Sequence, residues 1–279
     1  PYGTWIIREI ESPKGYVLSE EEIAVTIGKV DEVVEIELVN YFIKGNIALT
    51  KVDEDYPDNK LSGAVFEVYS DTNGDGKLDK DDTLLGEMKE LDGGVYQMSE
   101  LRYGKYLVKE TKAPTGFVLD ENVYSVSVEE NGKTYTVENK AGVGFINAAQ
   151  KGSLKIVKTS SDGKVEGFSF RVTGVDYDQT FKTDKNGEIV IEGLRIGDYT
   201  VSEVSDKASA GYILPADKQA TVKVDATAIV QMHNEFRDTP KTGDDFNLGL
   251  WVSLAALSVV GAGVLGFVSY KNRKKKKED

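Results

Sequence analysis

Gly104-Lys-Tyr106-Leu-Val108-Lys-Glu110 is one of three copies of a pattern, Gly-x-aromatic-x-aliphatic-x-Glu, that decides the fold. The other copies run from Gly3 to Glu9 and from Gly197 to Glu203. Alternate residues of a β-strand face the same side, so each glutamate shares a face with an aromatic and an aliphatic residue. The pattern predicts three strands whose glutamates point into a core, where an isolated carboxylate is costly.

The segments after the first two copies also match. Ser12-Pro13-Lys-Gly15-Tyr16-Val-Leu18 corresponds to Ala113-Pro114-Thr-Gly116-Phe117-Val-Leu119. After the third copy, Gly211-Tyr212-Ile-Leu214 comes two residues later than expected. The chain is therefore built from repeated modules, the third of which departs slightly from the other two.

Lysine and asparagine recur on apolar strand faces in the same way. Lys51 follows Ile47 and Leu49, and Lys158 follows Leu154 and Ile156, at alternate positions. Three further strands are expected to end in an inward asparagine: Ile36-x-Leu38-x-Asn40, Val143-x-Phe145-x-Asn147 and Val230-x-Met232-x-Asn234. Single inward polar residues can be edge-strand gatekeepers or hydrogen-bond partners. Their matched positions across the repeats favour a shared chemical purpose.

These three residue types suit one reaction. Burial lowers the pKa of a lysine and frees its lone pair, whereas a buried glutamate stays protonated and can polarise an amide. A neighbouring asparagine carboxamide is then an electrophile that can lose ammonia, and folding supplies the proximity. The expected product is a Lys–Asn isopeptide bond.

The modules resemble the B-type repeats of collagen adhesins and the SpaA-like pilin domains. The resemblance implies prealbumin-like or immunoglobulin-like β-sandwiches in which Lys, Glu and Asn form an autocatalytic crosslink. It pairs Lys51 with Asn147 through Glu110, and Lys158 with Asn234 through Glu203. Glu9 and Asn40 match as well, and their lysine is expected before residue 1. We therefore expect an all-β chain of tandem sandwiches: the C-terminal part of a truncated module (1–45) and two complete modules (46–150 and 151–237).

The C-terminal residues 238–279 form a three-part pattern. Residues 248–270 carry no charge and would reach about 34 Å as a helix, enough to cross a membrane. The basic tail 271–279 is expected on the cytoplasmic side. The arrangement resembles an LPXTG-type sorting signal, with Thr239 in the place of the family's leucine. The pentapeptide is Thr239, Pro240, Lys241, Thr242 and Gly243.

The resemblance implies that sortase cleaves after Thr242 and links this residue to peptidoglycan. Proline favours an extended peptide, and Gly243 lets a nucleophile approach the Thr242 carbonyl. The alternative is a permanent transmembrane anchor. No secretory signal opens the chain, so we expect an N-terminally truncated fragment of a protein from the Gram-positive cell wall.

The composition excludes several classes of function. The net charge of −13 disfavours nucleic-acid binding. The chain has no cysteine, which removes disulfides and thiol catalysis, and His233 is its single histidine. With no nucleophile–base set for a soluble substrate, we expect no enzyme activity beyond the intramolecular crosslinking.

One acidic loop matches the spacing of a calcium loop, with Gly76 at the turn. The segment Val65–Tyr69 before it is predicted to be a strand, and no helices are expected around it. The alternative is a solvated acidic hairpin, and no other cofactor is required. The expected ligands are Asp71, Asn73, Asp75, Lys77, Asp79 and Asp82.

These observations favour a wall-anchored extracellular stalk, either an adhesin or a pilin subunit. Its expected partners are sortase, peptidoglycan, and either a host extracellular-matrix or cell-surface ligand or other pilin subunits. One alternative is the spacer and anchor of a wall-bound enzyme whose catalytic domain lies before residue 1. Another is a ligand-binding module whose surface is ordered by loop 71–82.

Overall fold

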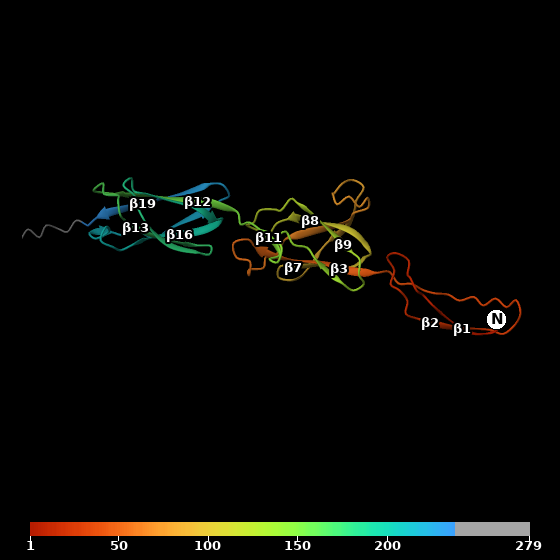
Figure 1. Cartoon of the computed structure of the whole chain (residues 1–279). Helices are drawn as coiled ribbons and strands as arrows, with labels where there is room; N and C mark the ends of the chain where they lie inside the picture. The colour runs from red at the N-terminus through yellow and green to blue at the C-terminus, as the bar shows by residue number, and fades with distance from the viewer. Residues whose placement is uncertain (238–279) are drawn as a thin grey trace, which may run out of the picture.

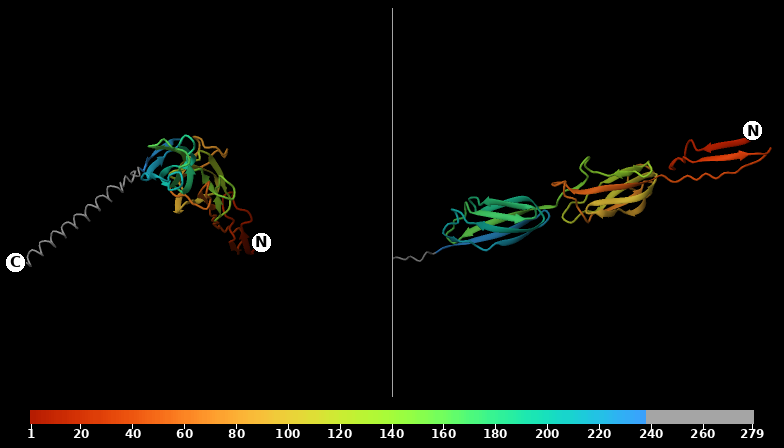
Figure 2. Two further views of the ribbon diagram at one scale, coloured as in Figure 1. Left: turned by 90° about the vertical axis from the view of Figure 1, so that its left-hand side faces the viewer. Right: turned by 90° about the horizontal axis from the view of Figure 1, so that it is seen from below.

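A computed structural model describes residues 1–237, which form three units that follow one another end to end (Figure 1). The same row is visible from below (Figure 2). Residues 1–43 are called the first module here, residues 44–150 the second and residues 151–237 the third. Residues 1–237 contain strands and no α-helix, which confirms the all-β prediction.

Within residues 1–237 we find no helix long and apolar enough to span a membrane. The predicted sorting pentapeptide, transmembrane span and basic tail all lie in 238–279, outside the described residues.

The second module is a sandwich of two sheets. One sheet has the strand order β10-β3-β7-β6, with β11 also paired to β3, and the other has the order β5-β4-β8-β9. Strands β10 and β11 both run parallel to β3. The strands are β3 (Lys44–Asp53), β4 (Val65–Ser70), β5 (Thr83–Glu87), β6 (Lys89–Asp92), β7 (Val95–Arg102), β8 (Gly104–Lys112), β9 (Val123–Val128), β10 (Thr134–Thr136) and β11 (Phe145–Asn147).

Alternation of side chains along these strands fills the space between the two sheets. Strand β3 buries Ile47 and Leu49 from one sheet, and β4 buries Phe66 and Val68 from the other. The Phe66 ring packs edge-on against Phe145, at 5.0 Å between ring centroids. Strand β4 covers the predicted strand Val65–Tyr69. Strand β3 begins at Lys44, just before the expected module boundary at residue 46.

The third module repeats this architecture. Its sheets have the orders β15-β12-β19-β17 and β14-β13-β16-β18. The strands are β12 (Lys151–Ser160), β13 (Ser169–Gly174), β14 (Tyr177–Lys182), β15 (Glu188–Arg195), β16 (Gly197–Val204), β17 (Tyr212–Ile213), β18 (Lys218–Val222) and β19 (Thr227–Phe236). Every strand pairs within its own module, and the second and third modules each have a separate apolar core. The segment 44–237 therefore contains all the strands and the complete apolar cores of both sandwiches.

The first module is an open structure. Its β1 (Gly3–Arg8) and β2 (Glu22–Ile27) form one antiparallel pair, and the strand expected over residues 36–40 is absent. Apolar side chains that the pattern assigned to a core are exposed, including Trp5 at 46%. The expectation of a buried face is thus wrong here. A two-stranded ribbon has no second layer to cover that face.

Because the second and third modules have separate cores, we expect them to unfold in separate transitions. Phe170 of β13 is fully buried in the third core. In the segment 44–237, Phe170→Ala should destabilise the third module by about 3–5 kcal/mol, the cost of a large core cavity. Differential scanning calorimetry should show that chiefly the transition of the third module moves. Ile229→Ala is the matched control because Ile229 is 63% exposed. Equal shifts of both transitions would contradict separate cores.

Candidate functional site: buried Lys–Glu–Asn clusters

In the second module, the predicted lysine, glutamate and asparagine meet between the sheets. Lys51 comes from β3 and Asn147 from β11 of one sheet, whereas Glu110 comes from β8 of the other. Asn147 Nδ2 donates to both carboxylate oxygens of Glu110, at 3.0 and 2.9 Å. Lys51 Nζ lies 3.7 Å from Glu110 Oε1. Exposure is 0% for Lys51 and Glu110 and 3% for Asn147, so water is nearly excluded from this cluster.

The surroundings of this cluster shift two pKa values toward the neutral forms. Burial lowers the pKa of Lys51 to about 8, although the carboxylates of Glu110 and Asp120 oppose this shift. Burial also raises the pKa of Glu110 above its ordinary range, against the hydrogen bonds from the Asp120 and Asn147 amides. Lys51 Nζ donates to the Phe145 carbonyl at 3.2 Å and lies 5.0 Å from the centre of the Phe145 ring. The amine is thus held against an aromatic wall.

The third module brings the same three residue types together, but the Lys158 amine donates to the Thr159 carbonyl and makes no ion pair with Glu203. Lys158 of β12 is 1% exposed, Glu203 of β16 is 9% exposed and Asn234 of β19 is fully buried. Asn234 Nδ2 donates to Glu203 Oε1 at 2.7 Å. Burial lowers the pKa of Lys158 and raises that of Glu203.

Strand register explains why the lysine and asparagine meet in both modules. Strands β3 and β11 are parallel, with Lys51 opposite Phe145 and Asp53 opposite Asn147. Strands β12 and β19 have the same offset, with Lys158 opposite Met232. The asparagine therefore sits diagonally across from the lysine on the inward face, within reach of a long side chain.

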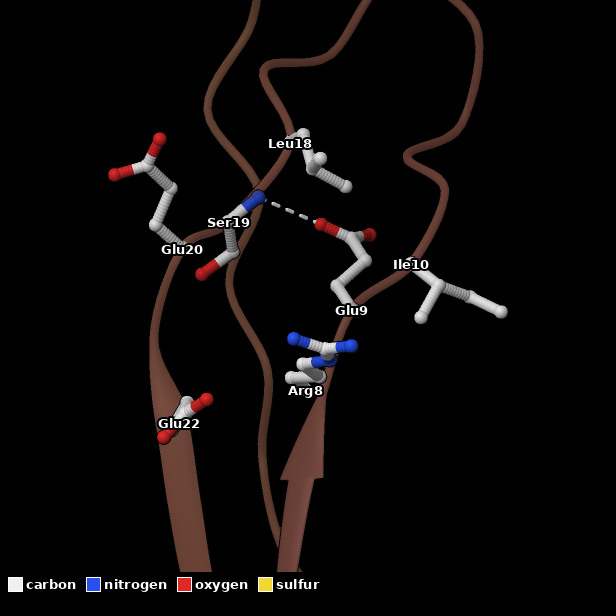
Figure 3. A pocket seen from close by; sticks show the side chains of 7 residues that line it. All are labelled: Arg8, Glu9, Ile10, Leu18, Ser19, Glu20 and Glu22. Atoms are coloured by element: carbon white, nitrogen blue, oxygen red, sulfur yellow. Dashed lines mark hydrogen bonds between the residues drawn. The ribbon is translucent and has the colours of Figure 1, made fainter.

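The first module contains the pair without a lysine. Asn40 Nδ2 donates to the Glu9 carboxylate at 2.7 and 2.9 Å. The Ser19 amide donates to Glu9 Oε2 at 2.8 Å, beside an open pocket that Arg8, Ile10 and Leu18 help to line (Figure 3). Glu9 and Asn40 are only partly buried.

The sequence pattern does not identify the backbone amide that donates a hydrogen bond to the glutamate. Asp120 N donates to Glu110 Oε2 at 2.8 Å, and Ser19 N makes the same bond to Glu9; each donor lies ten residues after its glutamate. The Pro-x-Gly-aromatic segment between them is the signal that could have revealed it. In the third module, where that segment is longer, Glu203 Oε2 has no hydrogen-bond partner.

Unsatisfied polar atoms concentrate at the two complete clusters. Within residues 1–237, four buried side-chain oxygens lack a partner: Asp71 Oδ1, Asn147 Oδ1, Glu203 Oε2 and Asn234 Oδ1. An unpaired buried oxygen costs about 1–3 kcal/mol, so native folds seldom keep one without a use. Both asparagine carbonyl oxygens are therefore available to a donor.

The acidic loop 71–82 joins β4 to β5 and bonds largely to itself. Asp71 is 7% exposed, and its Oδ2 accepts from the Gly76 amide at 3.1 Å. Asp82 accepts from the amides of Thr72 and Asp79, at 3.1 and 2.9 Å. In the described part of the chain, no group of three or more His, Cys, Asp or Glu residues is arranged to hold a metal ion.

His233 and the segment after β3 lie on the surface. His233 is half exposed in β19 and lies 2.8 Å from the Thr159 hydroxyl. The segment from Tyr56 to Lys60 forms a turn after β3. The His233 ring points to the outer face of β19, away from the buried Asn234 that follows it in the chain.

Comparisons with known proteins agree with this architecture. A family model described as SpaA, prealbumin-like fold domain, matches residues 1–41, 45–141 and 152–236. No curated protein sequence matches the chain significantly.

Among solved structures, the TIE protein of Bacillus anthracis is similar at 26% identity, with a TM-score of 0.64 over 85% of this chain. The chain spans 42% of that structure's length. The minor pilin GBS52 of the Gram-positive pathogen Streptococcus agalactiae matches at 17% identity (TM-score 0.32; 71% of this chain and 98% of that one). The D295N mutant of the shaft pilin SpaA of Lactobacillus rhamnosus GG matches at 15% identity (TM-score 0.33; 70% and 99%).

Calcium binding by loop 71–82 stays a prediction. An ion would draw on the unpaired Asp71 oxygen, and Asp82 would have to release its two amides. Isothermal titration of segment 44–237 with calcium chloride should show one site, lost in Asp71→Asn. Asp81→Asn is the control because Asp81 is not an expected ligand. If no heat of binding is measured, the loop is only an acidic hairpin.

Proposed function

This chain belongs to the SpaA family of prealbumin-like fold domains, and from that premise we propose that it is the wall-anchored stalk of a Gram-positive surface protein. It serves as an adhesin or a pilin subunit, and Lys–Asn isopeptide bonds reinforce its modules. The observation that carries this proposal is the water-excluded Lys51–Glu110–Asn147 cluster, which recurs with Lys158, Glu203 and Asn234. The proposed role is structural.

The crosslinking reaction uses the neutral forms that burial favours. The unprotonated Lys51 amine attacks Cγ of Asn147, while the protonated Glu110 carboxyl donates to Oδ1. A half-turn of the Asn147 amide would present that unpaired oxygen to Glu110. A new bond joins Nζ to Cγ, and the bond from Cγ to Nδ2 breaks. One lysine proton passes through the carboxyl to Nδ2, which leaves as ammonia, and the proton on Oδ1 returns to Glu110.

In the second and third modules, the crosslinks would join the first strand to the last. A bond closing a loop on the order of 100 residues stabilises a fold by about 4–5 kcal/mol through loss of unfolded-state entropy. Tension along the chain would then pass through a covalent bond and bypass the intervening strands. This suits a stalk without disulfides, since the chain contains no cysteine.

Wall attachment is proposed from the sequence alone. Sortase would cleave between Thr242 and Gly243 and join Thr242 to peptidoglycan. The GBS52 and SpaA structures are named as minor and shaft pilins, which supports a pilin subunit as one form of this role. A further partner would be either another pilin subunit or a host surface ligand.

The mass of segment 44–237 tests the crosslinks directly. Each bond releases one ammonia, so two bonds should lower the intact mass by about 34 Da. Glu110→Ala and Glu203→Ala should each restore about 17 Da, and the double variant should restore the full mass. Glu87→Ala, at an exposed position of β5, is the matched control and should keep the mass loss.

The conservative variants Glu110→Gln and Glu203→Gln separate chemistry from folding, because they preserve shape and remove the acid. Circular dichroism should show both variants folded and mass spectrometry should show them uncrosslinked. Folded wild-type protein of unshifted mass would mean that the buried clusters are only structural.

The pH dependence of bond formation follows from the two shifted pKa values. The reactive form has a neutral amine and a protonated carboxyl, and the ion pair has the same total number of protons. The ratio of these two forms therefore does not vary with pH. The rate should be flat between the raised pKa of Glu110 and about pH 8, the pKa of Lys51. It should fall about tenfold per pH unit outside that window.

Timed mass spectrometry can measure this profile in Glu203→Ala protein that is recovered unfolded from inclusion bodies and refolded at each pH. Only the Lys51–Glu110–Asn147 cluster can react in that variant. A rate that keeps rising above pH 9 would show that no protonated carboxyl takes part.

A further inference from the structure

At both junctions between modules, one linker residue makes the same two backbone hydrogen bonds. At the second junction, the Gln150 amide donates to the Gly116 carbonyl at 2.8 Å, and the Gln150 carbonyl accepts from the Ile196 amide at 3.1 Å. At the first, Ile43 donates to Gly15 at 2.9 Å and accepts from Tyr103 at 3.0 Å. One linker residue therefore bridges two modules in each case.

At both junctions, an arginine precedes the residue whose amide donates to the linker carbonyl. The Arg195 guanidinium bonds to both carboxylate oxygens of Asp53, at 2.7 and 2.9 Å, and to Asp55 at 3.0 Å. It also lies 5.0 Å from the centre of the Tyr56 ring. The side chains of Arg195 and Asp53 are only 14% and 3% exposed, so this pair between modules is shielded from water.

At the first junction, Arg102 lies 3.9 Å from the centre of the Phe42 ring. The backbone carbonyl of each arginine accepts a hydrogen bond from the hydroxyl of the tyrosine four residues later. Tyr106 donates to the Arg102 carbonyl at 2.5 Å, and Tyr199 donates to the Arg195 carbonyl at 2.9 Å. The intervening glycine has φ of 159° at Gly104 and 142° at Gly197, values that favour glycine.

We propose that these features form a docking joint, in which the Arg-x-Gly-x-Tyr connection between β7 and β8, or between β15 and β16, binds the linker and the facing end of the module before it. The partner that this end surface fits is therefore another module carrying the arginine. The joint holds the second and third modules at a fixed relative orientation. This inference does not depend on the isopeptide bonds.

Charge and geometry explain why the contact can be rigid. Domains joined by a short linker usually move relative to one another unless their interface resists it. A bidentate arginine–carboxylate contact constrains direction as well as distance, and it is stronger where water is partly excluded. Lys151 of the following module adds an ion pair with Asp55, at 3.1 Å, on the same surface.

Pulsed electron spin resonance on segment 44–237 tests the joint. Because the chain has no cysteine, spin labels can be placed cleanly on Ser125→Cys and Lys185→Cys, two exposed sites in different modules. The parent protein should give one narrow distance distribution. Arg195→Ala should widen it roughly twofold, toward the distribution of a variant with a glycine–serine insertion after Gln150.

Two further variants make the outcome decisive. Arg171→Ala removes an exposed arginine pair with Asp178 inside the third module and should leave the distribution unchanged. Asp55→Ala spares the buried Asp53 and should give an intermediate width. Circular dichroism confirms that each variant is folded. An unchanged width in folded Arg195→Ala, or a parent distribution as broad as that of the insertion variant, would overturn the proposal.

Discussion

The structure depends on how two sheets share a buried amine, carboxyl and carboxamide. Removing a charged lysine and a charged glutamate from water costs several kcal/mol per ion, and a hydrogen-bonded pair recovers only part of this. At Lys51 and Glu110 the cost shifts both pKa values toward the neutral forms. Burial therefore disfavours the ion pair and favours the proposed reaction, which would replace the ionisable amine by a neutral amide.

The glutamate is supported from outside the strand that carries it. In the first two modules an amide ten residues later binds the carboxylate, because the Pro-x-Gly-aromatic segment folds the chain back over the end of the strand. In the third module the longer segment leaves one oxygen of Glu203 without a partner. A two-residue difference in a turn thereby changes the hydrogen bonding of a residue buried in the core.

That turn also connects the inside of a module to its end. Gly116, in the middle of the Pro-x-Gly-aromatic segment, accepts from the linker residue Gln150, which in turn accepts from the next module. Asp53, which binds Arg195, lies two positions beyond Lys51 on β3 and opposite Asn147 on β11. The proposed crosslink and the proposed joint therefore share one strand pair, so a load carried by the first is passed directly to the second.

The sequence by itself determined the strand faces, the three Lys, Glu and Asn positions and the all-β class, because alternation along a strand is a local property. It did not determine that Asn147 lies diagonally from Lys51, since strand register depends on pairing across about 100 residues. Nor could it show that the first module leaves its apolar face open, or that Arg195 reaches Asp53. Those facts were decided by the tertiary structure, because each depends on which surfaces are brought opposite one another and shielded from water.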